Sequence, residues 1–144
     1  QRLGLPCIRA ATADAREKHA AWEAQANVVM ADVPCSGLGI IRKKPDIRYK
    51  NPKELAQLPL VQRAILENAS GYVRPGGTLV YSTCTVLPEE NEDVTGDFLD
   101  KHPEFEPVRT AFPLPVGPCP GQVTLWPQRH GTDGFYICRM RRKD

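Results

Sequence analysis

Short apolar runs alternate with amphipathic stretches along most of this chain. The run at residues 5–11 predicts a strand. The nearly continuous runs at 27–31 and 78–82 are typical of strands that are buried on both faces of a sheet. Each run leads into a segment that carries Asp or Cys, so the pattern predicts three strands with reactive side chains at their ends.

Helical spacing occupies the segments between these runs. Residues 15–25 are rich in Ala, Glu and Lys and predict a short helix, and residues 89–102 predict another, with acidic residues near its positive N-terminal end. From Lys53 onward, apolar residues recur at intervals of three or four and share one helix face. These residues are Leu55, Leu58, Val61, Ile65 and Leu66. Pro59 either lies in a first turn or divides this stretch into two helices. The sequence RPGG at 74–77 predicts the helix stop.

The C-terminal part of the chain is expected to contain a hairpin. Residues 103–121 hold six of the fourteen prolines and are predicted to be irregular, as are residues 37–52. Residues 123–126 and 135–140 predict two strands that flank a glycine-rich turn at 131–134. The alternation of strands and helices indicates an α/β protein with a largely parallel sheet and a C-terminal antiparallel hairpin.

Length and composition indicate a single globular domain. The chain has 144 residues, of which 41% are hydrophobic and 25% are charged. No run of eighteen apolar residues is present, and the first ten residues lack the pattern of a signal peptide. We therefore expect a cytoplasmic protein without a membrane partner. The chain begins without Met and in the middle of a pattern, as expected for a fragment of a longer protein.

Charge by itself does not identify a partner. The balance of 19 basic and 17 acidic residues gives a net charge of only +2, which is too small to predict nucleic-acid binding. Basic residues cluster at 42–44 and at 139–143. On charge alone, each cluster is interpreted as a solvated loop or tail.

The cysteines do not form a known framework. They are Cys7, Cys35, Cys84, Cys119 and Cys138. An odd number of widely spaced cysteines without a CxxC pair suits neither a set of disulfides nor a zinc site. The three histidines also lack a metal-like spacing, so we expect reduced thiols and no metal.

Reactive side chains follow the three predicted strands, at the edge where open α/β sheets bind ligands. Asp14 follows the first strand, Asp32 and Cys35 follow the second, and Cys84 follows the third. One interpretation is a functional site. The alternative is that both cysteines are small apolar fillers in the core. The pattern alone leaves both interpretations open.

Two of these segments resemble motifs of a known enzyme family. DVPCSGLG at 32–39 and STCT at 82–85 are similar to motifs IV and VI of the RNA cytosine-5 methyltransferases, in particular the bacterial Sun family that modifies small-subunit ribosomal RNA. Three further segments resemble that family in the same order. They are IRKKPDIRY at 41–49, RPGGTLVYSTCTVLPEENE at 74–92 and DGFYICRMRR at 133–142. The resemblance implies a partial Rossmann-like class I methyltransferase fold.

The resemblance also implies a reaction and the residues that perform it. C5 of cytosine is a poor nucleophile until a thiolate attacks C6, and sulfur both attacks well and leaves again. By resemblance, Cys84 makes this attack and Asp32 contacts the cytosine edge near N3, where negative charge develops. Cys35 matches the family cysteine associated with product release, although a packed thiol at a turn is the alternative. The methyl group comes from S-adenosylmethionine.

Cofactor and RNA contacts are expected at the neighbouring residues. Asp14 matches the family acid that binds the cofactor adenine, and it is equally suited to cap a helix that starts at Ala15. Asp14 and Asp32 are therefore expected to line the cofactor site. The basic residues of the 37–52 loop are expected to contact the RNA backbone, with simple solvation as the alternative. They are Lys43, Lys44 and Arg48.

The chain departs from the family pattern at its start. The glycine-rich cofactor loop and the acid that holds the ribose belong upstream of residue 1, so the chain matches the C-terminal portion of one methyltransferase domain. In the usual strand order 3-2-1-4-5-7-6, the two missing strands separate 5–11 from 27–31. We expect unpaired strand edges and weak or no binding of S-adenosylmethionine by this chain alone. We also expect that residues 1–26 are poorly ordered or repacked, or that two chains pair through the exposed edge.

Three other functions remain open from the sequence. The substrate of the same reaction is transfer RNA in related enzymes, which share both motifs. A non-catalytic RNA-binding fragment is a second possibility, because the cofactor loop is missing. A cysteine hydrolase is a third, and it requires a histidine beside Cys84, with His102 and His130 as candidates.

Overall fold

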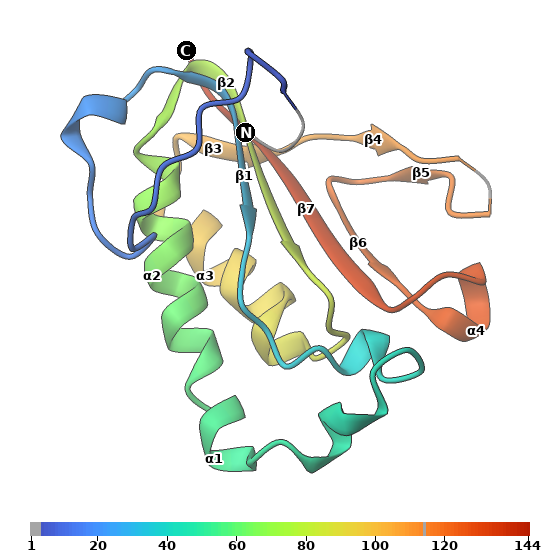
Figure 1. Cartoon of the computed structure of the whole chain (residues 1–144). Coiled ribbons are helices and arrows are strands. Elements are labelled where there is room, and N and C mark those ends of the chain that lie inside the picture. The colour runs from blue at the N-terminus through green and yellow to red at the C-terminus, as the bar shows by residue number, and fades with distance from the viewer. Residues whose placement is uncertain (1–3, 114) are drawn as a thin grey trace.

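The computed structural model describes residues 4–113 and 115–144, and its strands and helices follow one another as in Figure 1. In chain order they are β1 (Ala26–Asp32), α1 (Pro52–Leu55), α2 (Leu58–Ser70), β2 (Val73–Thr83), α3 (Glu92–Lys101), β3 (Phe105–Pro107), β4 (Thr110–Ala111), β5 (Pro118–Cys119), β6 (Gln122–Leu125), α4 (Pro127–His130) and β7 (Phe135–Arg142). Short 3₁₀ helices cover Ala20–Trp22, Leu38–Ile40, Pro45–Tyr49 and Pro88–Glu90. Within the described ranges, no helix has the length and apolar character needed to cross a bilayer.

The main sheet has the strand order β1-β2-β7-β3, and β6 also pairs with β7 (Figure 1). Strands β1 and β2 are parallel, whereas β7 is antiparallel to β2, β3 and β6. The predicted α/β architecture and the C-terminal antiparallel hairpin are confirmed. The hairpin connection contains the single helical turn α4, which ends at Gly131 in the left-handed conformation.

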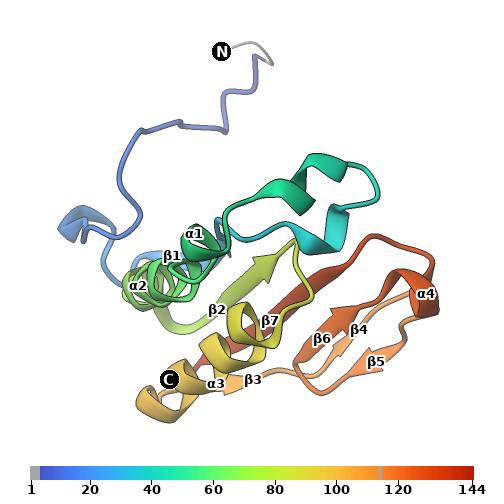
Figure 2. The ribbon, with the colours of Figure 1, turned by 90° about the horizontal axis from the view of Figure 1, so that it is seen from below.

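The core lies between one face of the sheet and the helices α2 and α3 (Figure 2). Because side chains alternate along a strand, the residues that face the helices lie two apart. The fully buried ones are Leu79, Tyr81, Thr83, Tyr136, Cys138 and Met140. The hydroxyl of Tyr136 lies 2.7 Å from the hydroxyl of Thr95 on α3, so α3 is hydrogen-bonded to β7 as well as packed against it.

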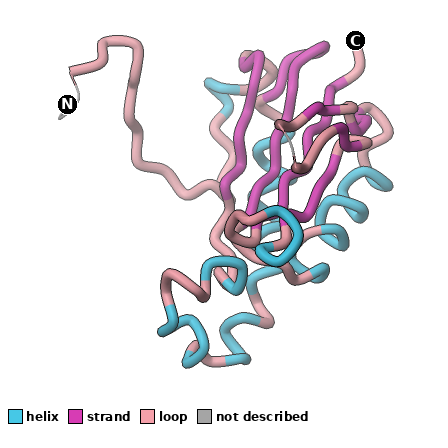
Figure 3. Tube along the Cα trace, turned by 90° about the vertical axis from the view of Figure 1, so that its right-hand side faces the viewer, coloured by secondary structure: helices cyan, strands magenta, loops and turns pink. Residues whose placement is uncertain are grey.

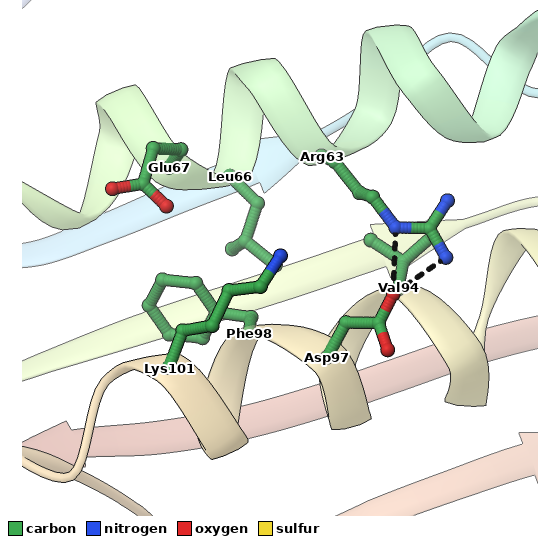
Figure 4. Close-up of a pocket in the computed structure, with 7 residues that line it drawn as sticks. All are labelled: Arg63, Leu66, Glu67, Val94, Asp97, Phe98 and Lys101. Atoms are coloured by element: carbon green, nitrogen blue, oxygen red, sulfur yellow. Dashed lines mark hydrogen bonds and ion pairs between the residues drawn. The ribbon is translucent and has the colours of Figure 1, made fainter.

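Helices α2 and α3 pack side by side, as the close-up in Figure 4 shows. Leu66, Val94 and Phe98 form the apolar part of their contact, and above it Arg63 binds Asp97 at 2.8 Å. The hollow between these side chains measures only about 30 Å³. None of the predicted site residues lines it, so this seam serves the packing of the two helices.

The predicted central helix is confirmed, but its stop is wrong. Pro59 lies in the first turn of α2, and the stretch is also divided, since α1 precedes it. Helix α2 ends at Ser70, and the predicted stop at 74–77 lies inside β2. There the register with β1 shifts, and Gly76 has a φ of +70°. A Cβ at Gly77 would meet a backbone oxygen at 2.8 Å, so the glycine pair forms a strand irregularity that other residues cannot adopt.

The N-terminal predictions are wrong in their secondary structure. Residues 5–11 form no strand, and of the predicted helix at 15–25 only Ala20–Trp22 is helical, as a 3₁₀ turn. The described segment from residue 4 onward runs along the outside of the domain and away from it (Figures 2 and 3), and residues 1–3 lie outside the described residues. A strand needs a partner for its backbone, and a short isolated helix is unstable in water.

The outer face of β1 is exposed, in contrast to the prediction of a strand buried on both faces. Val28 is 62% exposed and Met30 is 70% exposed, whereas Ala31 on the helix side is buried. Strand β1 lies at one end of the strand order, and the described residues place no further strand beside it. The apolar run therefore forms an edge strand whose second face is uncovered.

The segment 103–121 is more regular than predicted. It contains β3, which pairs with β7, and the two-residue strands β4 and β5, which pair with each other; residue 114 lies outside the described residues. The last predicted helix, at 89–102, is confirmed as α3 with a preceding 3₁₀ turn.

Candidate active site

The ends of the parallel strands β1 and β2 bring the predicted reactive residues together. Asp32, the last residue of β1, is in register with Ser82, and its Oδ1 accepts a hydrogen bond from the Ser82 hydroxyl at 3.0 Å. Cys35 and Cys84 follow these two positions, and their sulfur atoms lie 3.2 Å apart. The expectation that both loops meet at one edge of the sheet is confirmed by this geometry.

Burial keeps the thiol of Cys35 protonated. Cys35 and Cys84 are both half-buried. Burial raises the pKa of the Cys35 thiol to about 12, with a further contribution from its hydrogen bond to Cys84. At neutral pH, Cys35 is therefore a protonated thiol that can donate a hydrogen bond to the sulfur of Cys84.

Backbone contacts fix the position of Cys84 relative to two loops. Gly39, in the loop after β1, donates its N–H to the carbonyl of Cys84 at 3.0 Å. The N–H of Gly134, just before β7, donates to the carbonyl of Gly39 at 2.8 Å. A Cβ on Gly39 would overlap the carbonyl oxygen of Gly134, so only glycine allows this close crossing.

The residues that directly follow the two cysteines belong to a buried polar network that was not predicted from the sequence. The hydroxyls of Ser36 and Thr85 lie 2.7 Å apart, and both side chains are fully buried. Glu90 accepts the N–H of Ser36 at 2.9 Å and the side-chain N–H of Gln62 at 2.7 Å. Glu90 is one of the acidic residues near the N-terminal end of the predicted helix at 89–102, but it is 2% exposed and binds the loop that carries Cys35.

One sequence signal could have revealed this network. Gln62 lies four residues after Leu58 and four before Leu66, on the face of α2 that the apolar spacing assigns to the core. A glutamine at such a position must find buried hydrogen-bond partners. No comparable signal identifies Glu90, because glutamates are common near the start of a helix.

The two predicted cofactor residues line one cavity of about 390 Å³. Asp14 and Asp32 contribute carboxylates, and Val29, Ala31 and Ala69 contribute apolar wall. A mostly apolar cavity with a few polar groups is typical of a small-molecule site. The lining therefore fits a nucleoside-sized portion of a cofactor. Neither cysteine lines this cavity.

Asp14 is held in a turn by its neighbour. Its Oδ1 accepts the backbone N–H of Arg16 at 2.9 Å, and its Oδ2 binds the Arg16 guanidinium at 2.6 Å. These hydrogen bonds lower the pKa of Asp14 to about 2. The predicted capping contact is present, but no helix starts at Ala15, so Asp14 caps a turn instead.

The basic loop presents its three predicted residues in different ways. Lys43 binds Asp133 at 2.5 Å, and Arg48 donates to the carbonyl of Pro45 at 3.1 Å. The side chain of Lys44 is exposed and has no hydrogen-bond or ion-pair partner among the described residues. Lys44 is thus the residue of the three that is most available to an external anion.

The histidines give no support to a cysteine hydrolase. His102 lies between Glu67 and Glu104, at 2.8 and 3.0 Å, and His130 accepts the backbone N–H of Trp126 at 2.8 Å. Within the part of the chain that the structure describes, no histidine is hydrogen-bonded to Cys84. Nor do the described residues contain a cluster of His, Cys, Asp and Glu suited to a metal ion.

Known proteins are similar to this chain over most of its length. The model of the 16S rRNA methyltransferase family RsmB/F matches residues 1–141. The chain is 44% identical over 149 residues to a probable ribosomal RNA small subunit methyltransferase B of Bacillus subtilis, covering 99% of this chain and 33% of the relative. It is 41% identical over 119 residues to ribosomal RNA small subunit methyltransferase B of Thermus thermophilus, covering 82% and 30%. The chain therefore spans about a third of the length of the curated relatives that it matches.

Solved structures share the fold. The crystal structure of PH0851 is 34% identical with a TM-score of 0.86, covering 98% of this chain and 32% of that protein. NSun6 from Pyrococcus horikoshii with SFG is 26% identical with a TM-score of 0.72, covering 99% and 36%. These similarities confirm the Rossmann-like fold and the resemblance to the Sun family that the motifs indicated. The chain belongs to the RsmB/F family of 16S rRNA methyltransferases.

Proposed function

We propose that this chain carries the nucleophile of an RNA cytosine-5 methyltransferase that acts on small-subunit ribosomal RNA. The observation that carries the proposal is the contact of Cys35 and Cys84 in the loops that follow two parallel strands, the first of which ends at Asp32. The names of the curated relatives support the class of RNA. Transfer RNA remains the competing substrate, and a fragment that binds RNA without catalysis is the competing role.

The thiol of Cys84 suits the first bond of the reaction. As a thiolate, Cys84 forms a bond from Sγ to C6 of cytosine, and the C5–C6 π electrons move into the ring. C5 becomes nucleophilic and takes a methyl group, which S-adenosylmethionine supplies when bound. The C5 proton then passes to a base, the Sγ–C6 bond breaks, and its electrons return to sulfur. Cys35 acts at this last step, because its thiol can donate a hydrogen bond to the departing sulfur of Cys84.

Asp32 and Asp14 serve the two ligands from neighbouring positions. Asp32 ends β1 three residues before Cys35 and is held by the hydroxyl of Ser82. A carboxyl group that shares a proton with N3 of cytosine stabilises the negative charge that develops during attack. On its other side, Asp32 lines the cavity with Asp14, where these two residues and the apolar wall would hold part of S-adenosylmethionine.

The loop after Cys35 supplies contacts to the RNA backbone. Lys44 is exposed on this loop, and Lys43 is also exposed although it binds Asp133. Arg48 lies near the ring of Tyr49, with its guanidinium carbon 5.8 Å from the ring centroid. Cations that lie beside a catalytic edge attract phosphates without reading the base sequence.

A covalent trap tests the proposal. The complete gene product is incubated with S-adenosylmethionine and ribosomal RNA that contains 5-fluorocytosine, in which fluorine replaces the proton that must leave C5. We expect a protein–RNA complex that survives denaturing electrophoresis, with the RNA attached to Cys84 by peptide mass spectrometry. Cys84→Ala should give no complex, whereas Cys119→Ala, a buried cysteine outside the site, should behave as wild type.

The outcomes separate the alternatives. A complex with fluorinated transfer RNA and none with ribosomal RNA would mean that transfer RNA is the substrate. Binding of both RNAs without a covalent complex would mean that the protein binds RNA and does not catalyse the reaction. A complex that persists in Cys84→Ala would refute the assignment of the nucleophile.

A further inference from the structure

We propose that Gln62 and Glu90 are positioning residues that hold Cys35 against Cys84 and thereby set the rate at which the enzyme releases its methylated RNA. The inference rests on the proposed function, in which Cys35 assists the departure of Cys84 from C6. It assigns to two buried side chains a role in one step of the reaction.

The geometry is a clamp on both peptide groups that flank Cys35. The side-chain N–H of Gln62 donates to the carbonyl of Pro34 at 3.0 Å. Glu90 Oε2 accepts the N–H of Ser36 at 2.9 Å. The two clamping side chains are joined to each other at 2.7 Å. The backbone before Cys35 and the backbone after it are therefore held by one connected pair, which leaves this short loop little freedom to move its sulfur.

The same pair connects this loop to the strand that carries Cys84. The carbonyl of Glu90 accepts the hydroxyl of Tyr81 at 2.7 Å, and Tyr81 is a fully buried residue of β2, three positions before Cys84. Gln62 belongs to α2, which packs on both β1 and β2. The clamp therefore ties Cys35 to the same rigid elements that hold Cys84 in place.

Stabilisation of the fold does not explain the buried pair of Gln62 and Glu90. Gln62 is fully buried and Glu90 is 2% exposed. Gln62 Oε1 and Glu90 Oε1 have no hydrogen-bond partner among the described residues. Buried polar atoms without partners oppose folding, and an apolar pair of similar size would pack in this place at lower cost. A requirement on the position of the loop accounts for the polar pair.

The clamp predicts a specific kinetic defect. If Cys35 moves away from Cys84, the attack on C6 and the methyl transfer are unaffected, but the sulfur leaves C6 without its hydrogen-bond donor. The covalent enzyme–RNA complex should then accumulate on ordinary RNA. Loss of a proton-donating group commonly slows its step by about 100-fold or more. The slowing of RNA release in Cys35→Ala is therefore the largest that loss of the clamp can cause. Partial displacement of the thiol should slow release by about tenfold.

The test measures formation and breakdown of the complex in single turnovers. The complete gene product reacts with unmodified ribosomal RNA and S-adenosylmethionine, and denaturing electrophoresis follows the covalent complex with time. Glu90→Met removes the acceptor, and we expect normal formation with about tenfold slower breakdown. Glu90→Gln keeps an oxygen that can accept the Ser36 N–H, so release should be restored. Glu89→Met changes the exposed neighbouring glutamate and should match wild type.

The outcomes distinguish failure of the clamp from failure of the proposed function. If Cys35→Ala accumulates the complex and Glu90→Met does not, the clamp is refuted while the proposed function stands. If no variant forms a complex, including Cys35→Ala, the proposed function fails. Should Glu90→Met not fold by circular dichroism, Gln62→Met provides the second test, since it removes only the contact to Pro34 and the link to Glu90. Equal slowing of formation and breakdown in Gln62→Met would also overturn the inference.

Discussion

Cys35 lies with its sulfur 3.2 Å from that of Cys84, although 49 positions separate the two residues along the chain. The contact exists because β1 and β2 are parallel neighbours, so both loops leave the same edge of the sheet. Burial of Cys35 and its hydrogen bond to Cys84 raise the pKa of the Cys35 thiol to about 12. This relationship leads directly to a chemical prediction.

Alkylation should distinguish Cys35 from the exposed Cys7. The pKa of Cys35 is raised from 9.0 to about 12, so near pH 8 its thiolate fraction is about 1000-fold smaller than that of an ordinary thiol. Iodoacetamide should therefore modify Cys7 long before Cys35. Peptide mass spectrometry after timed alkylation between pH 7 and 9 checks the order.

The variant Cys84→Ala provides the control for this order. It removes the hydrogen-bond partner of Cys35 but leaves most of the burial, which is the larger cause of the raised pKa. Cys35 should react somewhat faster than in wild type and still more slowly than Cys7. Equal rates for Cys35 and Cys7 in the wild-type protein would contradict the buried, hydrogen-bonded arrangement.

Substitution of Gly39 by alanine should disrupt the site, whereas the same substitution at Gly96 should not. A Cβ on Gly39 overlaps the carbonyl of Gly134, so the loops that meet at Cys84 must separate. Overpacking of this kind costs about 1–3 kcal/mol. Gly96 lies within α3 with open space around it, and alanine there should stabilise the protein by about 0.5–1 kcal/mol. Urea unfolding measures both, and equal effects would argue against the crossing.

His102 should make the free energy of unfolding fall as the pH rises above about 6.5. Burial lowers the pKa of His102, but its hydrogen bonds with Glu67 and Glu104 raise it by more, so the net pKa is above 6.5. A raised folded-state pKa means that this stabilisation is complete below the unfolded value and is lost as the pH rises through the folded value. Its size should be less than about 1 kcal/mol, because both glutamates are exposed.

The variant His102→Asn isolates this effect. Asparagine also removes the stacking of His102 on Phe98, at 4.3 Å between ring centroids, so the informative quantity is the change of the difference with pH and not its absolute size. The difference in unfolding free energy between wild type and variant should therefore shrink from pH 6 to pH 9. A constant difference across this range would mean that the pKa of His102 is the same in the folded and the unfolded protein.

Lys44→Ala should weaken RNA binding in a salt-dependent manner. Lys44 is exposed on the loop after Cys35, and one lost phosphate contact reduces the slope of log K against log[salt] by about 1. The complete gene product is titrated with ribosomal RNA at several salt concentrations by fluorescence anisotropy. Lys18→Ala is the matched control, because Lys18 is exposed but bound to Glu23 at 2.9 Å. An unchanged slope in Lys44→Ala would remove this residue from the RNA surface.

Local patterns predicted much of the fold and part of the site. The spacing of Leu58, Ile65 and Leu66 located α2, and the apolar run before Asp32 located β1, because period and run length depend on neighbouring residues only. The glycine pair at 76–77 led to a wrong helix boundary, since the same residues can stop a helix or bend a strand. The predicted strand at 5–11 failed because pairing depends on a partner and not on the run itself.

The sequence by itself determined which residues are chemically able to act: a thiol after each of two strands and a carboxylate at the end of one. It determined the alternation of elements that makes an α/β sheet, and hence the edge to which those residues belong. Only the tertiary structure decided that the thiols touch, that Gln62 and Glu90 hold the loop between them, and that Gly39 crosses Gly134. Such contacts join segments about 30 to 95 residues apart, and no local period encodes them because they depend on strand order and register.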